Sequence, residues 1–412
     1  MHIGADGIET VKSAKCPYCG NNPVPHFLYW YFESFNILLA PVRRIFLHNF
    51  FSRFLRRRSE NVNLSYFFAK LGKLVGIIKF RDSLDLCKVE RAKVLWREAA
   101  FRNIRMEELL LFGRPIDTYI GEKGGRKIVF AGLPRPKNYD DRNLDLMDDK
   151  AFLKRLFVNN QLPVPKGGAA ASFAEAKKIF SQIKQNALVL GESSPPVIVK
   201  PRAGSRGRHS TTYIYSEEEF YSAFKIAKKL CHWVMVEEQL SGPVYRATLI
   251  NYELCGVLRG DPPQVVGDGA CTIKQLIEEK NAAAHPKVSS IKADGSMAMF
   301  LSRQRLTFES VPQKGERVNL SEKVGVNYGG SSAEDYDICH PENKQLFIQA
   351  ARAVADPIVG FDFIIPEISK SWKQQRCGFI EANSLPFINL HHDPLYGTPR
   401  NVAAKVWQLV GF

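Results

Sequence analysis

The sequence lacks the patterns that most often identify a nucleotide-binding or an exported protein. No segment reads G-x-x-x-x-G-K-[ST], and no apolar strand runs into G-x-G-x-x-G, which argues against the P-loop and Rossmann solutions for holding a nucleotide. The first 15 residues are polar and contain no apolar signal core, so we expect a protein that is not secreted and stays in the cytoplasm. No internal repeat and no low-complexity tract is present.

Long apolar runs and paired cysteines are also scarce. The aromatic stretch that begins at residue 27 reaches Pro41 after about 14 residues, whereas a helix that spans a bilayer needs roughly 20. We expect Pro41 to end this stretch. The eight cysteines are scattered, and only Cys16 and Cys19 lie close together, which fits a reducing compartment better than a disulfide framework.

Positive charge is present in excess but unevenly. The formal net charge is +15, and residues 41–105 hold 16 Lys and Arg against 5 Asp and Glu, so the rest of the chain is near balance. Within residues 27–58, one helical face after Pro41 is apolar with arginines around it: Ile45, Phe46, Phe50, Phe54 and Leu55. A core-facing helix is the favoured interpretation, and peripheral membrane contact is the alternative. Nucleic acid is not an expected partner.

The length and the hydrophobic pattern predict a mixed α and β chain. With 412 residues, 45% of them hydrophobic, the chain is long enough for two or three compact units. We expect residues 86–112 to be helical and residues 128–134 to form a strand. Short strands and helices then alternate from about residue 148. The expected helices are 148–161, 172–185, 271–281 and 341–355, and the expected strands are 195–201, 232–240, 358–365 and 377–384.

One loop combines positive charge with little side-chain bulk. The segment "VIVKPRAGSRGRHSTTYI" (197–214) holds no acidic residue and carries four basic ones, Lys200, Arg202, Arg206 and Arg208. Glycines between them allow backbone N–H groups to approach phosphate oxygens, and basic side chains neutralise phosphate charge. The loop therefore indicates a nucleotide phosphate site, with a basic hairpin turn as the equally weighted alternative.

Acidic and amide side chains interrupt two apolar strands near the C-terminus. Glu381 and Asn383 are two residues apart in "CGFIEANS" and so share a face, and Asp362 stands alone in "IVGFDFII". Such groups are costly to bury without partners. Together they make a hard oxygen site that suits Mg²⁺. A capped turn or a structural hydrogen bond is the alternative.

Taken in order, the segments from about residue 148 onward resemble the ATP-grasp superfamily. "DDKAFLKRLFVNNQLPVPKG" resembles the opening segment of these proteins, and "VIVKPRAGSRGRHS" resembles their lysine strand and glycine loop. "VMVEEQLSGPVYR" is similar to the adenine-binding hinge, and "GFDF…FIEANSLP" to the metal-binding strands. Residues 262–281 and 310–344 are more narrowly similar to the ATP-grasp module of cyanophycin synthetase and of bifunctional glutamate–cysteine ligase/glutathione synthetases.

The resemblance implies an architecture and an activity. It implies two α+β subdomains that grip ATP, 148–240 and 241–412, preceded by a basic, mostly helical N-terminal region, 1–147. It also implies a ligase that joins a small-molecule carboxylate to an amine through an acyl-phosphate, with an amino acid or a peptide as substrate. The alternative is an ATP-binding module without ligase activity that regulates an interaction made by the basic N-terminal region.

The resemblance also implies ligands and the residues that hold them. The implied cofactors are ATP and Mg²⁺, with two ions, and Mn²⁺ as a substitute. The matching ATP contacts are Lys150 and Lys200 for the phosphates, Gly204, Ser205, Arg206 and Gly207 in the loop over the γ-phosphate, and Glu237, Glu238 and Leu240 in the hinge. The matching metal ligands are Asp362, Glu381 and Asn383. The implied catalytic groups are Lys200, Arg246 and one of Arg303 and Arg305.

Some positions depart from the family or remain open. Val244 stands where many members carry an acid that binds ribose, and Gln161 replaces a glycine. The peptide ligase domain that follows this module in cyanophycin synthetase has no counterpart, so we do not expect cyanophycin synthesis. "HHDP" (391–394) is expected to line the substrate pocket.

The C-x-x-C pair, Cys16 and Cys19, is compatible with two kinds of chemistry. It has the form of a thiol redox site, but no apolar strand leads into it as a thioredoxin-like fold requires. It also has the form of half a zinc site, which His26 or His48 would complete. Neither is the main expectation, because no second C-x-x-C is present.

Overall fold

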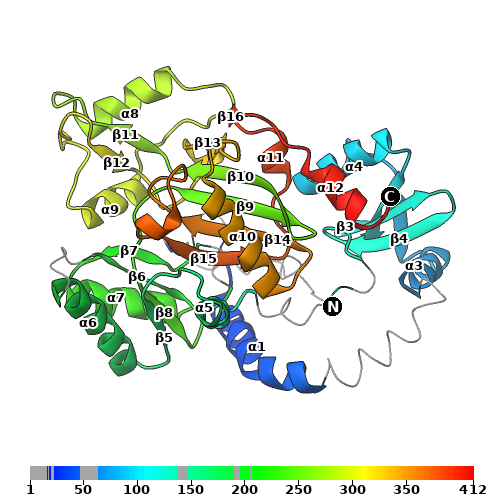
Figure 1. Ribbon diagram of the computed structural model, residues 1–412, viewed down its shortest axis with the longest axis horizontal. Coiled ribbons are helices and arrows are strands. Elements are labelled where there is room, and N and C mark those ends of the chain that lie inside the picture. Colours follow the sequence, from blue (N-terminus) through cyan, green and yellow to red (C-terminus); the bar gives the residue numbers. More distant parts are fainter. Residues whose placement is uncertain are drawn as a thin grey trace.

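The computed structural model describes residues 16, 18–19, 23–46, 64–136, 139, 147–189, 195–204 and 207–412. These residues form four β-sheets with helices around them (Figure 1). In that view a small antiparallel sheet near the N-terminus lies at one end, and a helical insertion lies at the other. A six-stranded sheet lies between them, so the expectation of a mixed α and β chain is confirmed.

The six-stranded sheet has the order β15-β14-β9-β10-β13-β16, antiparallel except for the β13–β16 pair. Its strands are β9 (Val244–Ile250), β10 (Glu253–Asp261), β13 (Ser331–Glu334), β14 (Ile358–Ile364), β15 (Gly378–Asn383) and β16 (Tyr396–Gly397). The strands expected at 358–365 and 377–384 are therefore confirmed.

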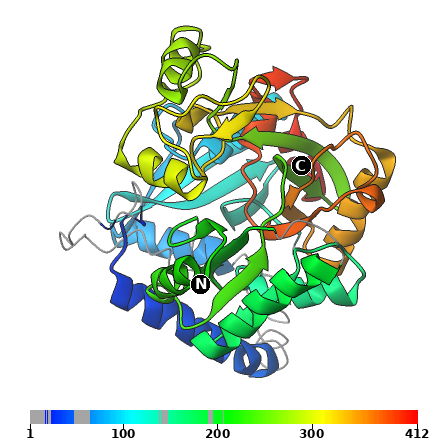
Figure 2. The ribbon, with the colours of Figure 1, turned by 90° about the vertical axis from the view of Figure 1, so that its left-hand side faces the viewer.

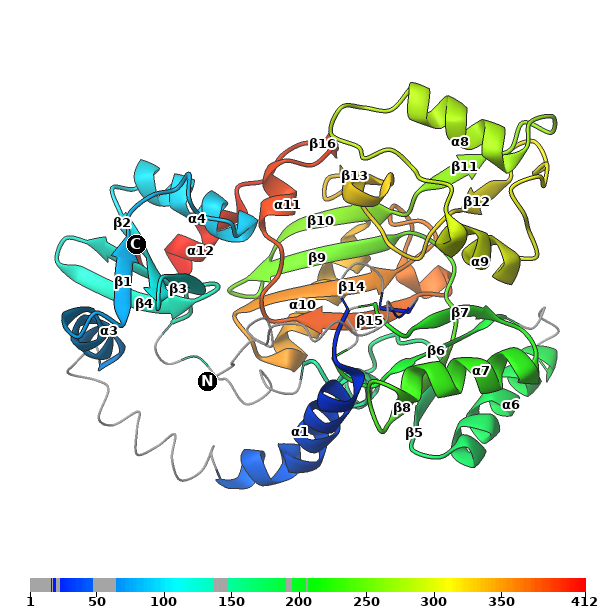
Figure 3. The same ribbon diagram turned by 180° about the vertical axis from the view of Figure 1, so that it is seen from behind.

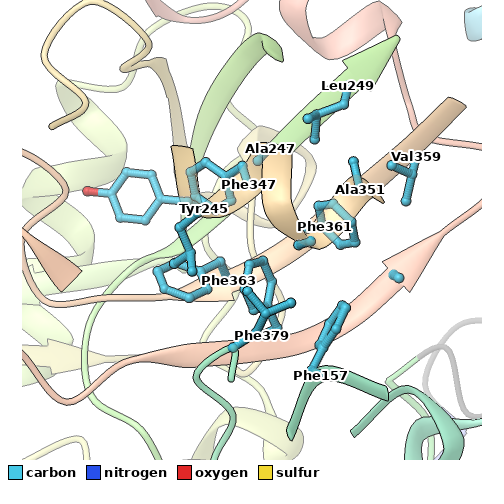
Figure 4. Close-up of a cluster of buried hydrophobic side chains, with 14 of the residues drawn as sticks. Phe157, Tyr245, Ala247, Leu249, Phe347, Ala351, Val359, Phe361, Phe363 and Phe379 are labelled. Carbon is cyan, nitrogen blue, oxygen red and sulfur yellow. The ribbon is translucent and has the colours of Figure 1, made fainter. Parts of the chain in front are cut away.

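One face of this sheet is apolar and covered by helices. Helices α5 (Lys150–Asn159) and α10 (Pro341–Val354) lie on it, and aromatic rings fill the space between (Figure 4). The contributing side chains include Phe157, Tyr245, Phe347, Phe361, Phe363 and Phe379. Arg246 and Asp362 alternate with core residues along β9 and β14 and so face away from this core. A register shift between β14 and β15 at Asp362/Phe363 pairs Glu381 with Asp362, although Phe379, two residues earlier, belongs to the core. The face of the sheet that packs against α5 and α10 is thus apolar, and the opposite face carries these charged side chains.

A smaller sheet carries the lysine strand and the glycine loop. Its antiparallel order is β5-β8-β6-β7, formed by β5 (Gly167–Ala170), β8 (Val234–Glu238), β6 (Val197–Pro201) and β7 (Thr211–Ile214). Helices α6 (Phe173–Val189) and α7 (Glu217–Lys228) cover it. Ser172 and Glu175 form a capping box at the start of α6. This sheet lies next to edge strand β15 of the larger one in Figures 1 and 3.

An insertion after β10 forms a separate small unit with its own apolar core. It contains β11 (Gln264–Val266), α8 (Ile273–Ala282), α9 (Gly295–Arg303), β12 (Arg317–Asn319) and the 3₁₀ turn η4 (Val326–Tyr328). The remaining short elements in this half are η5 (Trp372–Gln374) and α11 (Asn389–His392). The helix expected at 271–281 is confirmed as α8.

The described N-terminal region holds a sheet as well as helices. It contains α1 (His26–Phe46), α3 (Leu64–Leu74), β1 (Ile78–Arg81), α4 (Glu90–Phe101), β2 (Arg105–Leu111), β3 (Arg114–Lys123) and β4 (Arg126–Ala131). The last helix of the chain, α12 (Val402–Leu409), packs against α4, where Trp407 donates a hydrogen bond to Leu95 O at 3.0 Å.

The expectation of one helix over residues 86–112 is wrong in its second half. Helix α4 ends at Phe101, a turn follows in which Asn103 has a φ of 55°, and "RMEELLL" then forms strand β2. The residues of β2 have good helix propensity, but pairing with β1 and β3 overrides that preference. Glu108, buried at the centre of β2, is compensated by an ion pair with Arg81.

Helix α1 ends later than expected, and its described part carries an exposed apolar face. It runs through Pro41 to Phe46, because an internal proline removes one hydrogen bond and bends a helix without always ending it. Its apolar residues form an exposed stripe: Phe27, Leu28, Tyr31, Phe32, Phe35 and Leu38. The side chains of Ile45, Phe46 and the apolar residues beyond them lie outside the described residues. Among the described helices, none is both long and apolar enough to cross a bilayer.

Candidate active site

The polar face of the six-stranded sheet aligns charged side chains in one row. In the strand register Asp362 lies opposite Arg246 on β9 and opposite Glu381 on β15. One step along the strands, Gly360 lies between Thr248 and Asn383 in the same way. Because residues two apart share a face, both rows point to the side away from the aromatic core. The sheet therefore brings together all three residues expected to bind metal.

Asp362 is only partly compensated by its surroundings. Its carboxylate is buried, and Arg246 Nε lies 3.3 Å from its Oδ1. Burial raises the pKa of Asp362 to about 6, with the Arg246 guanidinium acting against the rise and the Glu381 carboxylate adding to it. The Arg246 guanidinium also lies 5.6 Å from the centroid of the Phe387 ring. Asp362 thus has one arginine on one side and a second carboxylate, that of Glu381, on the other.

A pocket opens over these rows and includes about 310 Å³ of empty space, counting the solvent at its mouth. Arg246, Asp362 and Asn383 line it, together with Phe387 and His391 from the segment after β15. His391 therefore lines a pocket beside the predicted metal ligands, as its position after the E-x-N strand predicts. That this pocket binds substrate remains a prediction.

His391 is fixed by a buried network. Its Nδ1 lies 2.6 Å from Glu334 Oε2, and its Nε2 lies 2.8 Å from Thr248 Oγ1. Glu334 in turn accepts a hydrogen bond from Val257 N at 2.7 Å. A Cβ at Gly256 would collide with the imidazole, so the close approach of the histidine requires glycine there. Sequence analysis did not find Glu334 or Thr248, because their link to His391 is visible only in the fold.

The lysine strand carries a second buried charge cluster. Lys200 Nζ lies 2.8 Å from Glu237 Oε2, and Lys154 Nζ lies 2.7 Å from Glu237 Oε1. Burial by itself would raise the pKa of Glu237, but the two lysines overcome it and lower the pKa to about 2. Lys154 was not expected in this site. It follows Lys150 by one helical turn, which is the only sequence signal for it.

The hinge acids bind other parts of the protein. Glu238 accepts a hydrogen bond from Lys166 N at 2.7 Å and forms an ion pair with Arg376. Since Glu237 is engaged by lysines, both carboxylates of the hinge are occupied, and Leu240 is buried. If this hinge reads adenine, it does so with backbone groups rather than with these side chains.

The glycine loop uses part of its charge internally. Arg202 makes two hydrogen bonds to Asp149, at 2.7 and 2.6 Å, and Arg208 is buried with its guanidinium 5.4 Å from the Tyr29 ring centroid. Gly204 and Gly207 have φ values of 67° and 77°, which favour glycine. Ser205 and Arg206 lie outside the described residues. Much of the positive charge that indicated phosphate binding is thus already paired.

The chain is similar to known proteins in fold and in sequence. A bifunctional glutathione synthetase from Pasteurella multocida superposes with a TM-score of 0.52 at 24% identity, over 77% of this chain and 43% of that one. The chain has the ATP-grasp fold. In sequence it is 30% identical over 304 residues to the glutathione biosynthesis bifunctional protein GshAB of Clostridium perfringens, over 72% of this chain and 38% of that protein.

Cyanophycin synthetase of Trichormus variabilis is 28% identical to this ATP-grasp chain over 273 residues, which cover 65% of this chain and 29% of that protein. No protein-family model matches the chain. The relationship to ATP-grasp ligases expected from the sequence is therefore confirmed. The chain spans less than half of the length of each of these three relatives.

The two remaining arginines lie at the junction between the ATP-grasp small sheet and the insertion. Arg303 Nη1 lies 2.6 Å from Glu322 Oε1, which also accepts a hydrogen bond from Thr212 on β7. Arg305 has a φ of 62°, and its guanidinium lies 5.3 Å from the Tyr215 ring centroid. Neither lines the pocket around Asp362. Their catalytic role remains a prediction.

Lys150 and the cysteine pair complete the set of expected residues. Lys150 begins α5, and its backbone N donates a hydrogen bond to Arg202 O at 3.1 Å, which places it beside the glycine loop. Its side chain makes no ion pair with the residues that the structure describes.

Cys16 and Cys19 lie beside His26 and His209. His48 lies outside the described residues.

Proposed function

We propose that the chain is an ATP- and Mg²⁺-dependent ligase that joins a carboxylate to an amine through an acyl-phosphate. The observation that carries the proposal is the row of Arg246, Asp362 and Glu381 across three neighbouring strands, with Asn383 on the same face. The buried Asp362 carboxylate next to a second carboxylate is costly to a fold, and such an arrangement is typical of a site that receives a cation. The relationship to ATP-grasp ligases supports the same activity.

The reaction has two steps. A carboxylate oxygen of the first substrate attacks the γ-phosphorus of ATP, and the bond to the bridging oxygen of ADP breaks. The amine nitrogen of the second substrate then attacks the acyl carbon, the C–N bond forms, phosphate leaves, and the nitrogen loses a proton. The protein mainly positions the reactants and neutralises their charge in the first step.

The residues of this chain divide that work between two sheets. Lys150 and Lys200 bind the phosphates of ATP, and the pairing of Lys200 with Glu237 fixes the direction of its side chain. Arg246 binds the substrate carboxylate and stabilises the charge that develops on the acyl-phosphate, with the Phe387 ring next to its guanidinium. Either Arg303 or Arg305 assists from the junction with the insertion.

The oxygen ligands on the polar face fit Mg²⁺. Asp362 and Glu381 supply carboxylates and Asn383 supplies an amide oxygen, which are the ligand types that Mg²⁺ prefers. The raised pKa of Asp362, caused by burial, is the sign of a carboxylate with too little positive charge nearby. When bound, Mg²⁺ neutralises triphosphate oxygens and polarises the γ-phosphoryl group. Mn²⁺ has similar ligand preferences and is a suitable probe.

The proposed substrates are amino acids or short peptides. Two curated relatives are named for glutathione biosynthesis and for cyanophycin synthesis. The guanidinium of Arg246 in the pocket favours a substrate that carries a carboxylate.

The test is ADP release by the purified full chain with Mg-ATP, screened across amino acids and short peptides singly and in pairs. We expect release only when one carboxylate and one amine are both present, with one phosphate released for each C–N bond formed. Nucleotide binding without stimulated release across the whole panel would contradict the ligase and favour an ATP-binding regulatory module.

The exposed stripe of α1 supports a second, separate role as a peripheral membrane contact. Six large apolar side chains of α1 face solvent, and the sequence that follows is rich in arginine. An apolar helix face next to basic residues is typical of helices that bind anionic membranes. Co-sedimentation with anionic vesicles, lost in 0.5 M salt and in Phe32→Ser/Leu38→Ser, is the expected result, and equal binding to zwitterionic vesicles would contradict it.

A further inference from the structure

Four metal-binding side chains from two distant parts of the chain meet beside the glycine loop. Cys16 and Cys19 come from the N-terminal segment, His26 begins α1, and His209 ends the loop after β6. Their ligand atoms all lie within 4.8 Å of one another. Cys19 and His209 are buried, with 4% and 1% of their surface exposed.

Three sulfur–nitrogen separations in this cluster are close to those of a tetrahedral centre. Cys19 Sγ lies 3.2 Å from His26 Nε2 and 3.4 Å from His209 Nε2, and Cys16 Sγ lies 3.6 Å from His209 Nε2. With Zn–S about 2.3 Å and Zn–N about 2.0 Å, sulfur and nitrogen ligands of a tetrahedron lie roughly 3.5 Å apart. A turn in which Cys19 N donates to Cys16 O at 3.1 Å brings the two thiols to the same side.

The orientation of His209 leaves its second nitrogen available as a ligand. Its Nδ1 lies 2.8 Å from Ile226 O, and because a carbonyl oxygen only accepts, Nδ1 carries the proton. Nε2 of the neutral ring then presents its lone pair to the two thiols. A backbone carbonyl that fixes the tautomer in this way is the usual support of a metal-bound histidine. His209 also holds a φ of 53°, an uncommon conformation for a residue other than glycine.

We infer that Cys16, Cys19, His26 and His209 form a structural zinc site that fastens the N-terminal segment to the glycine loop. Two thiolates and two imidazoles in tetrahedral arrangement select Zn²⁺ over Mg²⁺ or Ca²⁺, and a set of four protein ligands leaves no open position for catalysis. The site is separate from the proposed ligase chemistry and does not depend on it.

Other contacts join the same two parts of the molecule. His209 N donates to Tyr18 O at 3.0 Å, and the Tyr29 hydroxyl donates to Gly204 O at 2.9 Å, so both ends of the loop are attached to the N-terminal segment. His232 N donates to Ser34 Oγ at 2.9 Å. Figure 2 shows α1, in dark blue, running along the green unit that carries the loop. The zinc site would thus hold the loop over the ATP-binding sheet in a fixed position.

Metal content tests the inference directly. The full chain, purified without metal-affinity resin and kept reduced, is expected to contain about one zinc per chain by elemental analysis. Cys19→Ser and His209→Asn are expected to lose it, and Cys271→Ser and His285→Asn, which alter side chains outside the cluster, are expected to keep it. Replacement of zinc by Co²⁺ should give the absorption of tetrahedral thiolate coordination in the wild type and in His26→Cys, which preserves four ligands.

Several outcomes would overturn the inference. They are a reduced wild-type chain that neither contains nor takes up zinc, and full zinc content in Cys19→Ser. Hydrogen exchange tests the fastening itself in the folded wild type. Removal of zinc by a chelator is expected to speed amide exchange at residues 207–210 while leaving β14 unchanged, and unchanged exchange at 207–210 would contradict the link to the loop.

Discussion

The two sheets that form the ATP-grasp unit each bury a carboxylate, but they compensate it differently. Glu237, in the small sheet, lies within 2.8 Å of two lysines, and its pKa is lowered to about 2 against the effect of burial. Asp362, in the large sheet, has Arg246 at 3.3 Å and the Glu381 carboxylate close by, and burial raises its pKa to about 6. In the first cluster two lysines outnumber one carboxylate, whereas in the second two carboxylates lie near one arginine.

This difference suggests a structural role for the cluster around Glu237 and a cation-binding role for the cluster around Asp362. A completed ion pair holds its members in place, so Glu237 serves to direct Lys200. An incomplete cluster costs folding energy that a bound cation would offset. If Glu237 supports the fold and Glu381 binds a cation, as we propose, replacing each acid should have opposite consequences for stability and activity.

The largest effect is expected on activity for Glu381→Gln. Loss of one carboxylate ligand should lower kcat by about 100-fold or more, because metal ions contribute several kcal/mol of charge stabilisation. Removing one of two adjacent carboxylates also relieves their repulsion, so the melting temperature should not fall. ADP release and thermal unfolding measure the two effects, with Glu253→Gln as an exposed control. Unchanged ADP release would rule out Glu381 as a ligand.

For Glu237→Gln the main expected effect is a loss of stability. It leaves two buried lysines without their counter-charge, which typically costs about 3 kcal/mol in the free energy of unfolding. The double variant Glu237→Gln/Lys154→Met removes one of those charges and should recover part of the loss. Urea unfolding of the three proteins measures this difference. A single variant as stable as the wild type would show that the cluster is not what holds this part of the fold.

Acid should weaken the wild type through Glu237. Its folded pKa of about 2 lies below the ordinary value near 4.3, so its stabilising contribution is complete above that ordinary value and is lost as the pH falls toward 2. Between pH 4.5 and 2.5 the wild type should therefore lose more stability than Glu237→Gln. Denaturant titrations at several pH values give the two slopes. Parallel slopes would mean that Glu237 is not strongly ion-paired.

A smaller effect is expected for Arg246→Lys. The ammonium keeps the positive charge beside Asp362 but lacks the planar fork that binds a carboxylate through two hydrogen bonds. We expect KM for the carboxylate substrate to rise about tenfold, roughly the contribution of one charged hydrogen bond, with KM for ATP little changed. Initial rates with each substrate varied separately distinguish these cases. An equal rise in both KM values would argue against a specific role in carboxylate binding.

Local patterns in the sequence were enough to predict most of the ATP-grasp elements. Apolar strands with isolated polar residues located Asp362, Glu381 and Asn383, and the strand register joins them. Strand β2 was missed because "RMEELLL" has helix-forming residues and becomes a strand only by pairing with β1 and β3. Pro41 was overestimated as a helix breaker.

Contacts between residues far apart in the chain could not be predicted from the sequence. Nothing local to Glu237 identifies Lys154 as its partner, and nothing local to Cys16 identifies His209, 193 residues away. The paired state of Arg202 likewise depends on Asp149 and on the packing of α5. Residue types in the sequence predicted metal and phosphate binding. Only the structure shows which charged side chains are paired within the protein and which are available to a ligand.

The row around Asp362 is proposed to bind a divalent cation together with ATP. Electron paramagnetic resonance of Mn²⁺, titrated into the full chain in the presence of a non-hydrolysable ATP analogue, measures this binding. We expect the wild type to bind Mn²⁺ and Glu381→Gln to bind fewer ions or to bind them at least about tenfold more weakly, while Glu253→Gln matches the wild type. Identical Mn²⁺ binding by the wild type and Glu381→Gln would contradict it.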